Sequence, residues 1–218
     1  MLDVFMIDMR PYRGPNGANL ETAEGGVAAF LGPDQLAWLK QALLDSRATW
    51  KVIAADMPLS LVVWDQFVDN KGKGFEAVSN NNAGAPLGRE LEFADLLRFI
   101  KAAGIKNTVW LTADVHYTAA HYYDPNKAQF QDFEPFWEFV SGPIHAGTFG
   151  PGELDMTFGP EAKYVKAPPA GQVNLSPASG LQFFGHVKIA ADTGVMTVTL
   201  YDTADTALWS TDIQPAKA

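Results

Sequence analysis

Three short apolar runs, each followed by an aspartate, limit what this chain can fold into. They span residues 2–7, 50–55 and 108–113, and the aspartates that follow are Asp8, Asp56 and Asp114. Continuous apolar runs of this length are typical of strands that are buried on both faces, as in parallel sheets. Helical patterns separate the runs, so the sequence predicts an α/β fold built from βαβ units.

The first helix follows Pro33, where Leu36, Leu39 and Leu43 recur at helical spacing. Proline is favoured at the first position of a helix. The second helix covers residues 89–103 with an apolar stripe on one face, and Gly104 ends it.

The carboxyl third has a different pattern. Residues 136–140, 186–191 and 195–201 are typical of strands without intervening helices, and the last two runs are joined by Asp192, Thr193 and Gly194, a hairpin signal. We therefore treat 1–218 as one unit, with a βαβ-type part at 1–135 and a mainly antiparallel part at 136–218. Between the helices, residues 65–88 form a long loop that contains Lys71, Gly72 and Lys73; loops of this length are usually functional or disordered.

Charge and composition exclude several classes of function. The net charge of −9 gives no general attraction to nucleic acid or to anionic lipid, so neither is an expected partner. The chain has no cysteine, which removes disulfides, thiolate nucleophiles and cysteine-ligated zinc. No run approaches the roughly 18 apolar residues of a membrane span.

The most informative pair is Asp114 and His116. In an extended segment, side chains two residues apart share one face, and a carboxylate with an imidazole can ligate neighbouring metal ions. The alternative is a capping aspartate and a hydrogen-bonded histidine at the end of a strand.

Several separated motifs resemble the PhoD-type alkaline phosphatases of the calcineurin-like metallophosphoesterase superfamily. They comprise residues 2–10 with Tyr12 and Arg13, Leu31 and Gly32 with Gln35, Trp38 and Leu39, Gly88 to Glu90, residues 107–120, and residues 136–150. The resemblance implies a layered α/β/β/α sandwich and metal-dependent hydrolysis of phosphate mono- and diesters. It also implies a binuclear or trinuclear metal centre that contains iron and calcium.

The same resemblance assigns roles to individual positions. Asp114 and His116 occupy the positions of metal ligands, and Asp56 stands where many superfamily members carry a ligand histidine, although a strand-end cap is an equal alternative. Arg89 resembles an arginine at the edge of the active-site cleft, the alternative being charge pairing with Glu90 or Glu92. His145 either approaches the phosphate or satisfies a buried backbone carbonyl.

The ligand set in this chain is incomplete, because the early aspartate motifs and the cysteine of the family pattern are not found. We therefore expect the carboxyl-terminal half of such an enzyme. Its expected partners are a phosphate-ester substrate and either the missing amino-terminal half or a second copy, through residues 2–7 and 50–55. The alternative is a non-catalytic remnant or a split-enzyme half that binds a partner chain. The sequence leaves the compartment undecided, while the resemblance implies an exported parent enzyme, periplasmic or extracellular.

Overall fold

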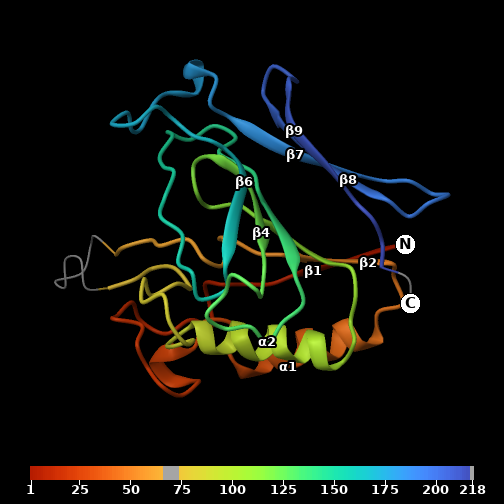
Figure 1. Ribbon diagram of the computed structural model, residues 1–218. Helices are drawn as coiled ribbons and strands as arrows, with labels where there is room; N and C mark the ends of the chain where they lie inside the picture. Colours follow the sequence, from red (N-terminus) through yellow and green to blue (C-terminus); the bar gives the residue numbers. More distant parts are fainter. Residues whose placement is uncertain (66–73, 217–218) are drawn as a thin grey trace.

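A computed structural model describes residues 1–65 and 74–216, and a six-stranded sheet forms its centre (Figure 1). The strand order is β1-β2-β3-β5-β4-β6. Their bounds are Leu2–Met6, Trp50–Ala54, Thr108–Thr112, Thr118–Tyr123, Phe136–Val140 and Pro160–Lys166 for β1 to β6. Strands β1, β2, β3 and β5 run parallel, whereas β4 pairs antiparallel with both β5 and β6.

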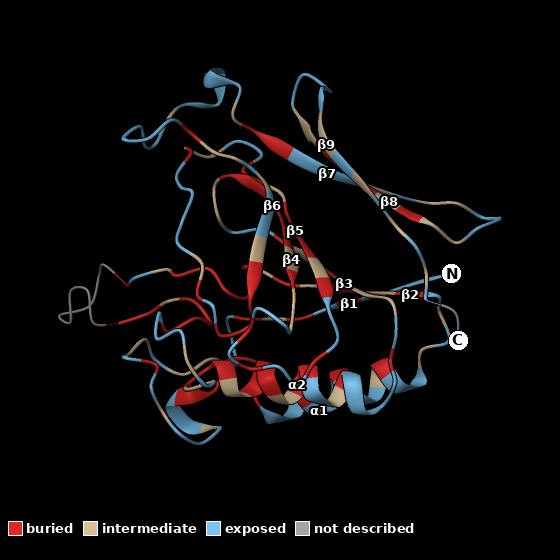
Figure 2. Ribbon diagram, in the orientation of Figure 1, coloured by how far each residue is buried: buried red, intermediate tan, exposed pale blue. Residues whose placement is uncertain are grey.

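Two helices cover one face of this sheet (Figure 1). Helix α1 spans Pro33–Asp45 and begins directly after Gly32, whose φ of 75° suits a residue without a side chain. Helix α2 spans Glu90–Ala102, and its buried stripe includes Phe93, Leu97 and Ile100. Both helices pack on the larger apolar core, where the buried parts of α1 and α2 face the sheet (Figure 2).

A second, three-stranded antiparallel sheet lies beyond the opposite face (Figure 1). It contains β7 (Phe183–Ile189), β8 (Met196–Asp202) and β9 (Ala207–Ile213). Alternation along β2 explains how the layers meet: Ile53 belongs to the core under the helices, while Val52 belongs to the core between the sheets. Trp50 joins the sheets directly, because its Nε1 donates to the carbonyl oxygen of Gly194 at 2.6 Å.

These elements confirm the predicted α/β class and both helices. Two 3-10 helices, Gly26–Ala28 and Pro177–Ser179, complete the regular structure of the described residues. The described residues form helix, sheet and sheet layers, and the outer helical layer of the expected α/β/β/α sandwich is not among them. Neither α1 nor α2, within the part of the chain that the structure describes, has the length and apolar content needed to cross a bilayer.

One expectation about the strands is wrong. Strand β5 was expected in an antiparallel region, yet it pairs parallel with β3, and Leu111 lies opposite Phe139. The pattern of apolar residues cannot reveal this, because β5 fills the position beside β3 only after the chain has passed through β4. The apolar pattern also did not predict β4, β6 or β9. Lys71, Gly72 and Lys73 lie outside the described residues.

Candidate functional site

The ends of three parallel strands bring Asp8, Asp56 and Asp114 to one edge of the six-stranded sheet. Backbone pairing continues past the strands, because the amide of Ala113 donates to the carbonyl oxygen of Asp56 at 2.9 Å. Ligand sites in open α/β sheets lie at this edge. The strand-end aspartates therefore share one edge, as the sequence predicted.

Asp114 sits in a strained turn after β3. Its φ of 60° is left-handed, a conformation that aspartate tolerates better than most residues. Its Oδ1 accepts a hydrogen bond from Nη2 of Arg10 at 3.1 Å. Burial raises the pKa of Asp114, the charge of Arg10 lowers it, and the net direction is upward. Such strain is common at functional sites, where the surroundings hold the residue in place.

Arg10 links two carboxylates at this edge. Its Nη1 lies 2.7 Å from Oε1 of Glu76, in addition to the contact with Asp114, and its own amide donates to Oδ1 of Asp8 at 2.7 Å. Nearly half of the side chain is exposed. Neither Arg10 nor Glu76 is among the site residues predicted from the sequence. Arg10 could have been predicted, because it lies two residues beyond the strand-end aspartate Asp8. Glu76 could not, because no neighbouring sequence feature points to it.

His116 lies in the turn between β3 and β4, and its Nδ1 is hydrogen-bonded to the carbonyl oxygen of Gly147. A carbonyl can only accept, so Nδ1 carries a ring proton, and in the neutral imidazole Nε2 is then the atom with the lone pair. Phe149 packs on the ring with 5.2 Å between centroids, and its amide donates to the carbonyl oxygen of His116 at 3.3 Å. This arrangement is typical of a histidine that ligates a metal through Nε2.

A cavity of 410 Å³ adjoins this pair. Asp114 and His116 line it together with mainly apolar side chains, Leu61, Val62, Val63, Trp64, Val115, Tyr117 and Phe149, and with Gly150 and Gly152. The volume falls in the range of small-molecule sites, which combine apolar walls with a few polar groups.

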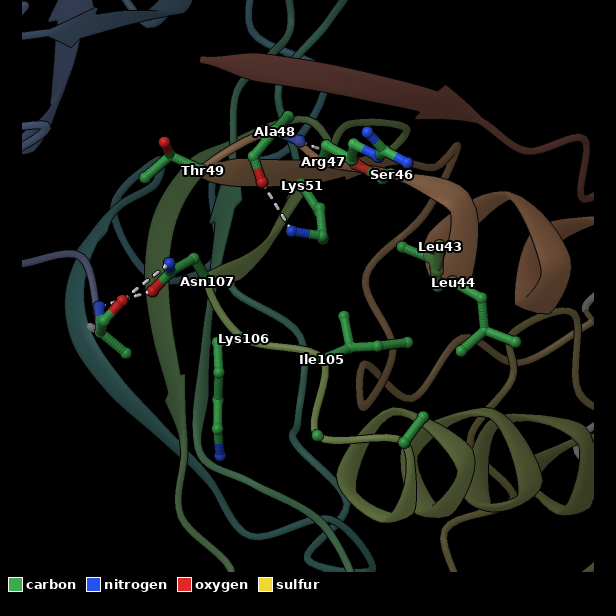
Figure 3. Close-up of a pocket in the computed structure, with 13 residues that line it drawn as sticks. Leu43, Leu44, Ser46, Arg47, Ala48, Thr49, Lys51, Ile105, Lys106 and Asn107 are labelled. Carbon is green, nitrogen blue, oxygen red and sulfur yellow. Dashed lines mark hydrogen bonds between the residues drawn. The ribbon is translucent and has the colours of Figure 1, made fainter. Parts of the chain in front are cut away.

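A second cavity lies at the opposite ends of the strands (Figure 3). It measures 510 Å³ and is lined by the segments that lead into β2 and β3, by Lys51 at the start of β2, and by the carboxyl ends of α1 and α2. Lys51 donates to the carbonyl oxygen of Ala48 at 2.7 Å. This cavity contains none of the predicted site residues.

Asp56 is half-buried at the sheet edge. Its charge raises the pKa of both Asp114 and Arg10, which places its carboxylate near them. The carboxylate accepts no hydrogen bond from the described residues, so the alternative of a strand-end cap is not observed. Its role as a metal ligand stays a prediction.

The donors present do not make a complete metal centre. Within residues 1–65 and 74–216, no three histidine, aspartate or glutamate side chains gather closely enough to hold a metal ion. Asp114 and His116 supply two donors, and Arg10 already occupies Oδ1 of Asp114. We therefore assign no catalytic step to a metal held by these residues alone.

Arg89 is buried, with 1% of its surface exposed. Its Nη1 donates to the carbonyl oxygens of Phe75, Glu76 and Ala77 at 3.0, 2.8 and 3.1 Å. Burial lowers the pKa of Arg89 to about 10. The alternative of pairing with Glu90 or Glu92 is wrong, because backbone carbonyls take these donors. This geometry favours a structural role over a place at the edge of a catalytic cleft.

His145 is exposed in the loop between β5 and β6. Its side chain forms no hydrogen bond with the described residues. It also does not line the cavity beside His116. The alternative that it satisfies a buried carbonyl is therefore wrong. An approach to the phosphate stays a prediction.

A buried network supports the wall of the cavity. The carboxylate of Glu138 accepts from the amide of Leu59 at 2.9 Å, from Nδ1 of His121 at 2.8 Å and from the hydroxyl of Tyr123 at 3.0 Å. Leu59 lies two residues before Leu61, which lines the cavity. His121, which was not among the predicted site residues, is 1% exposed.

Fold and site together define an α/β protein with an acidic, histidine-containing site beyond the ends of its parallel strands. The chain belongs to the PhoD-like phosphatase family, which matches residues 1–200. A solved structure of PhoD shares the fold, with a TM-score of 0.52 and 14% sequence identity. The match covers 100% of this chain and 42% of that chain, so this chain spans less than half the length of the solved one. No curated protein sequence matches this chain.

Proposed function

We propose that this chain is part of a phosphate-ester hydrolase and supplies Asp114, His116 and Arg10 to its reaction centre. The observation that carries the proposal is the hydrogen bond from Nδ1 of His116 to Gly147, because in the neutral imidazole it makes Nε2 the atom with the lone pair, and His116 lines a cavity together with Asp114. Membership of the PhoD-like phosphatase family supports the choice of a phosphate ester as substrate.

Each side chain has a distinct part in this proposal. Arg10 is partly exposed and charged, so its guanidinium can hold an anionic phosphate oxygen at the sheet edge. Asp114 and Glu76 hold that guanidinium in position through the two contacts described above. The apolar wall of the cavity limits access of water to the reacting group.

We extend the proposal to metal-dependent hydrolysis of mono- and diesters, with iron and calcium as the family resemblance implies. Metal ions of this kind lower the pKa of a bound water and polarise phosphoryl oxygens. Asp114 and His116, with Asp56 as a third candidate, are too few for such a centre. The remaining ligands would come from another polypeptide segment, for which we propose the amino-terminal half of the same enzyme.

The test measures hydrolysis of bis(p-nitrophenyl) phosphate and of p-nitrophenyl phosphate by the purified chain, alone and with that amino-terminal segment added in trans or fused. We expect background rates alone, with well under one iron per chain by elemental mass spectrometry, and turnover after addition. His116→Ala should remove most of the restored rate. His186→Ala is the matched control, because His186 is an exposed histidine on β7.

Two outcomes would contradict the proposal. Near-full turnover by the His116→Ala variant would show that the histidine is not part of the centre. Binding of the added segment without any turnover would favour the alternative, a non-catalytic half that recognises a partner chain.

A further inference from the structure

The cavity beside His116 has a polar part and an apolar part. Asp114 and His116 form the polar part, and the remaining side chains of the lining are apolar or aromatic, namely Leu61, Val62, Val63, Trp64, Val115, Tyr117 and Phe149. Burial raises the pKa of Tyr117 to about 12, so its phenol is uncharged near neutral pH. The apolar part therefore offers a bound group a wall without charge.

Two aromatic side chains of this wall are open to solvent. Trp64 is 39% exposed and Phe149 is 44% exposed. Single exposed apolar side chains are common on soluble proteins. Here, however, both rings line the same cavity, and Phe149 packs on the His116 imidazole with 5.2 Å between centroids. The accessible aromatic surface thus lies directly beside the group to which the proposed reaction is assigned.

Backbone pairing fixes the position of Trp64. It forms an antiparallel bridge with Phe75, and the two rings lie 4.3 Å apart between centroids. The amide of Glu76 donates to the carbonyl oxygen of Val63 at 2.9 Å, and the carboxylate of Glu76 holds Arg10 at 2.7 Å. The same pair of segments therefore positions both Trp64 and Arg10.

A second pair of segments fixes another part of the wall. The amide of Val62 donates to the carbonyl oxygen of Glu153 at 2.9 Å. A Cβ atom at Gly152 would lie 2.7 Å from Cδ1 of Leu61, so the close approach of the two segments requires glycine there. The apolar part is thus shaped by the fold itself, as in most small-molecule sites.

The composition of the wall selects the chemistry of its occupant. A sugar or a glycerol group would bury its hydroxyls against mainly hydrocarbon surface and lose their hydrogen bonds to water. An aromatic ring loses no such bonds and gains contacts with the rings of Trp64 and Phe149. The cavity measures 410 Å³, near the lower end of the range for small-molecule sites, which suits a ring better than a long acyl chain.

We propose that the apolar part of this cavity binds an aromatic group of the phosphate ester, with the phosphate on the side of His116 and Arg10. The inference rests on the proposed function for the position of the phosphate, and it adds the substrate class, aryl esters of phosphoric acid. Trp64 is then a residue that determines specificity, because it contacts the aromatic group and not the phosphate.

The experiment measures binding to the full chain, followed by the NMR signals of the Val115 and Phe149 amides, since both residues line the cavity. Phenylphosphonate and methylphosphonate carry the same anionic group and differ in the ring. We expect phenylphosphonate to bind about tenfold more tightly, because the ring buries apolar area. Benzyl alcohol, which has no phosphonate, should shift the same signals, whereas glycerol should not.

Substitutions at Trp64 test the assignment of the ring site. Trp64→Ala should remove most of the difference between the two phosphonates, and Trp64→Phe should retain it. Trp38→Ala is the matched control, because Trp38 is 49% exposed on α1 and does not line the cavity. Equal affinities for the two phosphonates would overturn the inference. So would a full difference in Trp64→Ala, or amide signals that benzyl alcohol leaves in place.

Failure of this inference and failure of the proposed function give different results. If the chain joined to its amino-terminal segment shows no turnover, a ring-dependent affinity that requires Trp64 still supports the aromatic site. If the joined enzyme hydrolyses glycerol phosphate and phenyl phosphate with equal kcat/KM, and Trp64→Ala changes neither value, the hydrolase proposal stands and the aromatic site is wrong.

Discussion

The Nδ1 atom of His116 and the carbonyl oxygen of Gly147 are hydrogen-bonded across a loop that joins β5 to β6. This single contact sets the tautomer of the imidazole, and the position of Gly147 in turn depends on its lack of a side chain. A Cβ atom at Gly147 would lie 2.0 Å from Oδ1 of Asn174.

Gly147→Ala should therefore displace the loop and release the His116 ring. We expect the single Nδ1-protonated tautomer to be replaced by a mixture, measured by nitrogen chemical shifts of the imidazole. Gly17→Ala is the control, because a Cβ at Gly17 meets no atom within 4 Å. An unchanged imidazole spectrum in Gly147→Ala would argue against this coupling.

Arg89→Met should destabilise the protein by about 3 kcal/mol, because several buried carbonyl oxygens lose their donor. Arg98→Met should change stability by less than about 1 kcal/mol, since Arg98 is 53% exposed in a surface pair with Asp132. The free energy of unfolding in urea measures both. Equal effects would mean that the carbonyls around Arg89 are solvated in the native state.

Glu138→Leu should cost about 3–5 kcal/mol, because the donors of Leu59, His121 and Tyr123 would remain buried without an acceptor. The comparison is Glu134→Leu, which removes an exposed carboxylate. Hydrogen exchange of the Leu59 amide should accelerate only in the first variant; slow exchange there in both would contradict the assignment.

Acid should selectively weaken the contribution of Glu161. Hydrogen bonds from Lys127 and then Lys163 lower the pKa of Glu161 to about 2. A lowered carboxyl pKa gives stability that is present above the unfolded value near 4.5 and is lost as pH falls toward 2. The Tm difference between the wild type and Glu161→Gln should thus be larger at pH 6 than at pH 2.5. The difference should remain small and shrink in 0.5 M salt, because Glu161 is at the surface; a difference that does not change with pH would refute it.

The sequence predicts self-association through residues 2–7 and 50–55, and the structure leaves only the first of these two segments at a sheet edge. Trp50–Ala54 is covered on both sides by β1 and β3, while β1 pairs only with β2 among the described strands. Val4 and Met6 are 55% and 71% exposed on this edge strand. Unpaired edges with apolar side chains promote association.

We therefore expect concentration-dependent association of the isolated chain in light scattering, and its loss in Val4→Lys and Met6→Lys. Val27→Lys, at an exposed valine in the 3-10 helix Gly26–Ala28, should leave association unchanged. A wild-type chain that stays monomeric at all concentrations would contradict the prediction.

The spacing of apolar residues was sufficient to predict the helices and the strands β1, β2 and β3. Each of these elements is buried through residues that lie close together in the sequence. The spacing placed Asp114 and His116 at a strand end for the same reason, whereas their assignment as metal ligands came from the family resemblance and stays a prediction. It could not locate Glu76, which reaches Arg10 from a loop 66 residues away. The sequence pattern also could not show that Arg89 is buried. Most of its hydrogen-bond partners are backbone carbonyl groups, which every residue has and which therefore leave no sequence signal.

Strand β4 is synthesised before β5 and β6, the two strands with which it pairs. It lies between β5 and β6, so a chain emerging from the ribosome carries Thr118–Tyr123 with no strand to pair with until at least Phe136–Val140 has followed. The turn that contains Asp114 and His116 leads directly into this unpaired strand, and Gly147 is synthesised after both β4 and β5. A nascent chain halted near Tyr123 would therefore contain Asp114 together with Arg10, but it would lack Gly147, whose carbonyl oxygen orients His116.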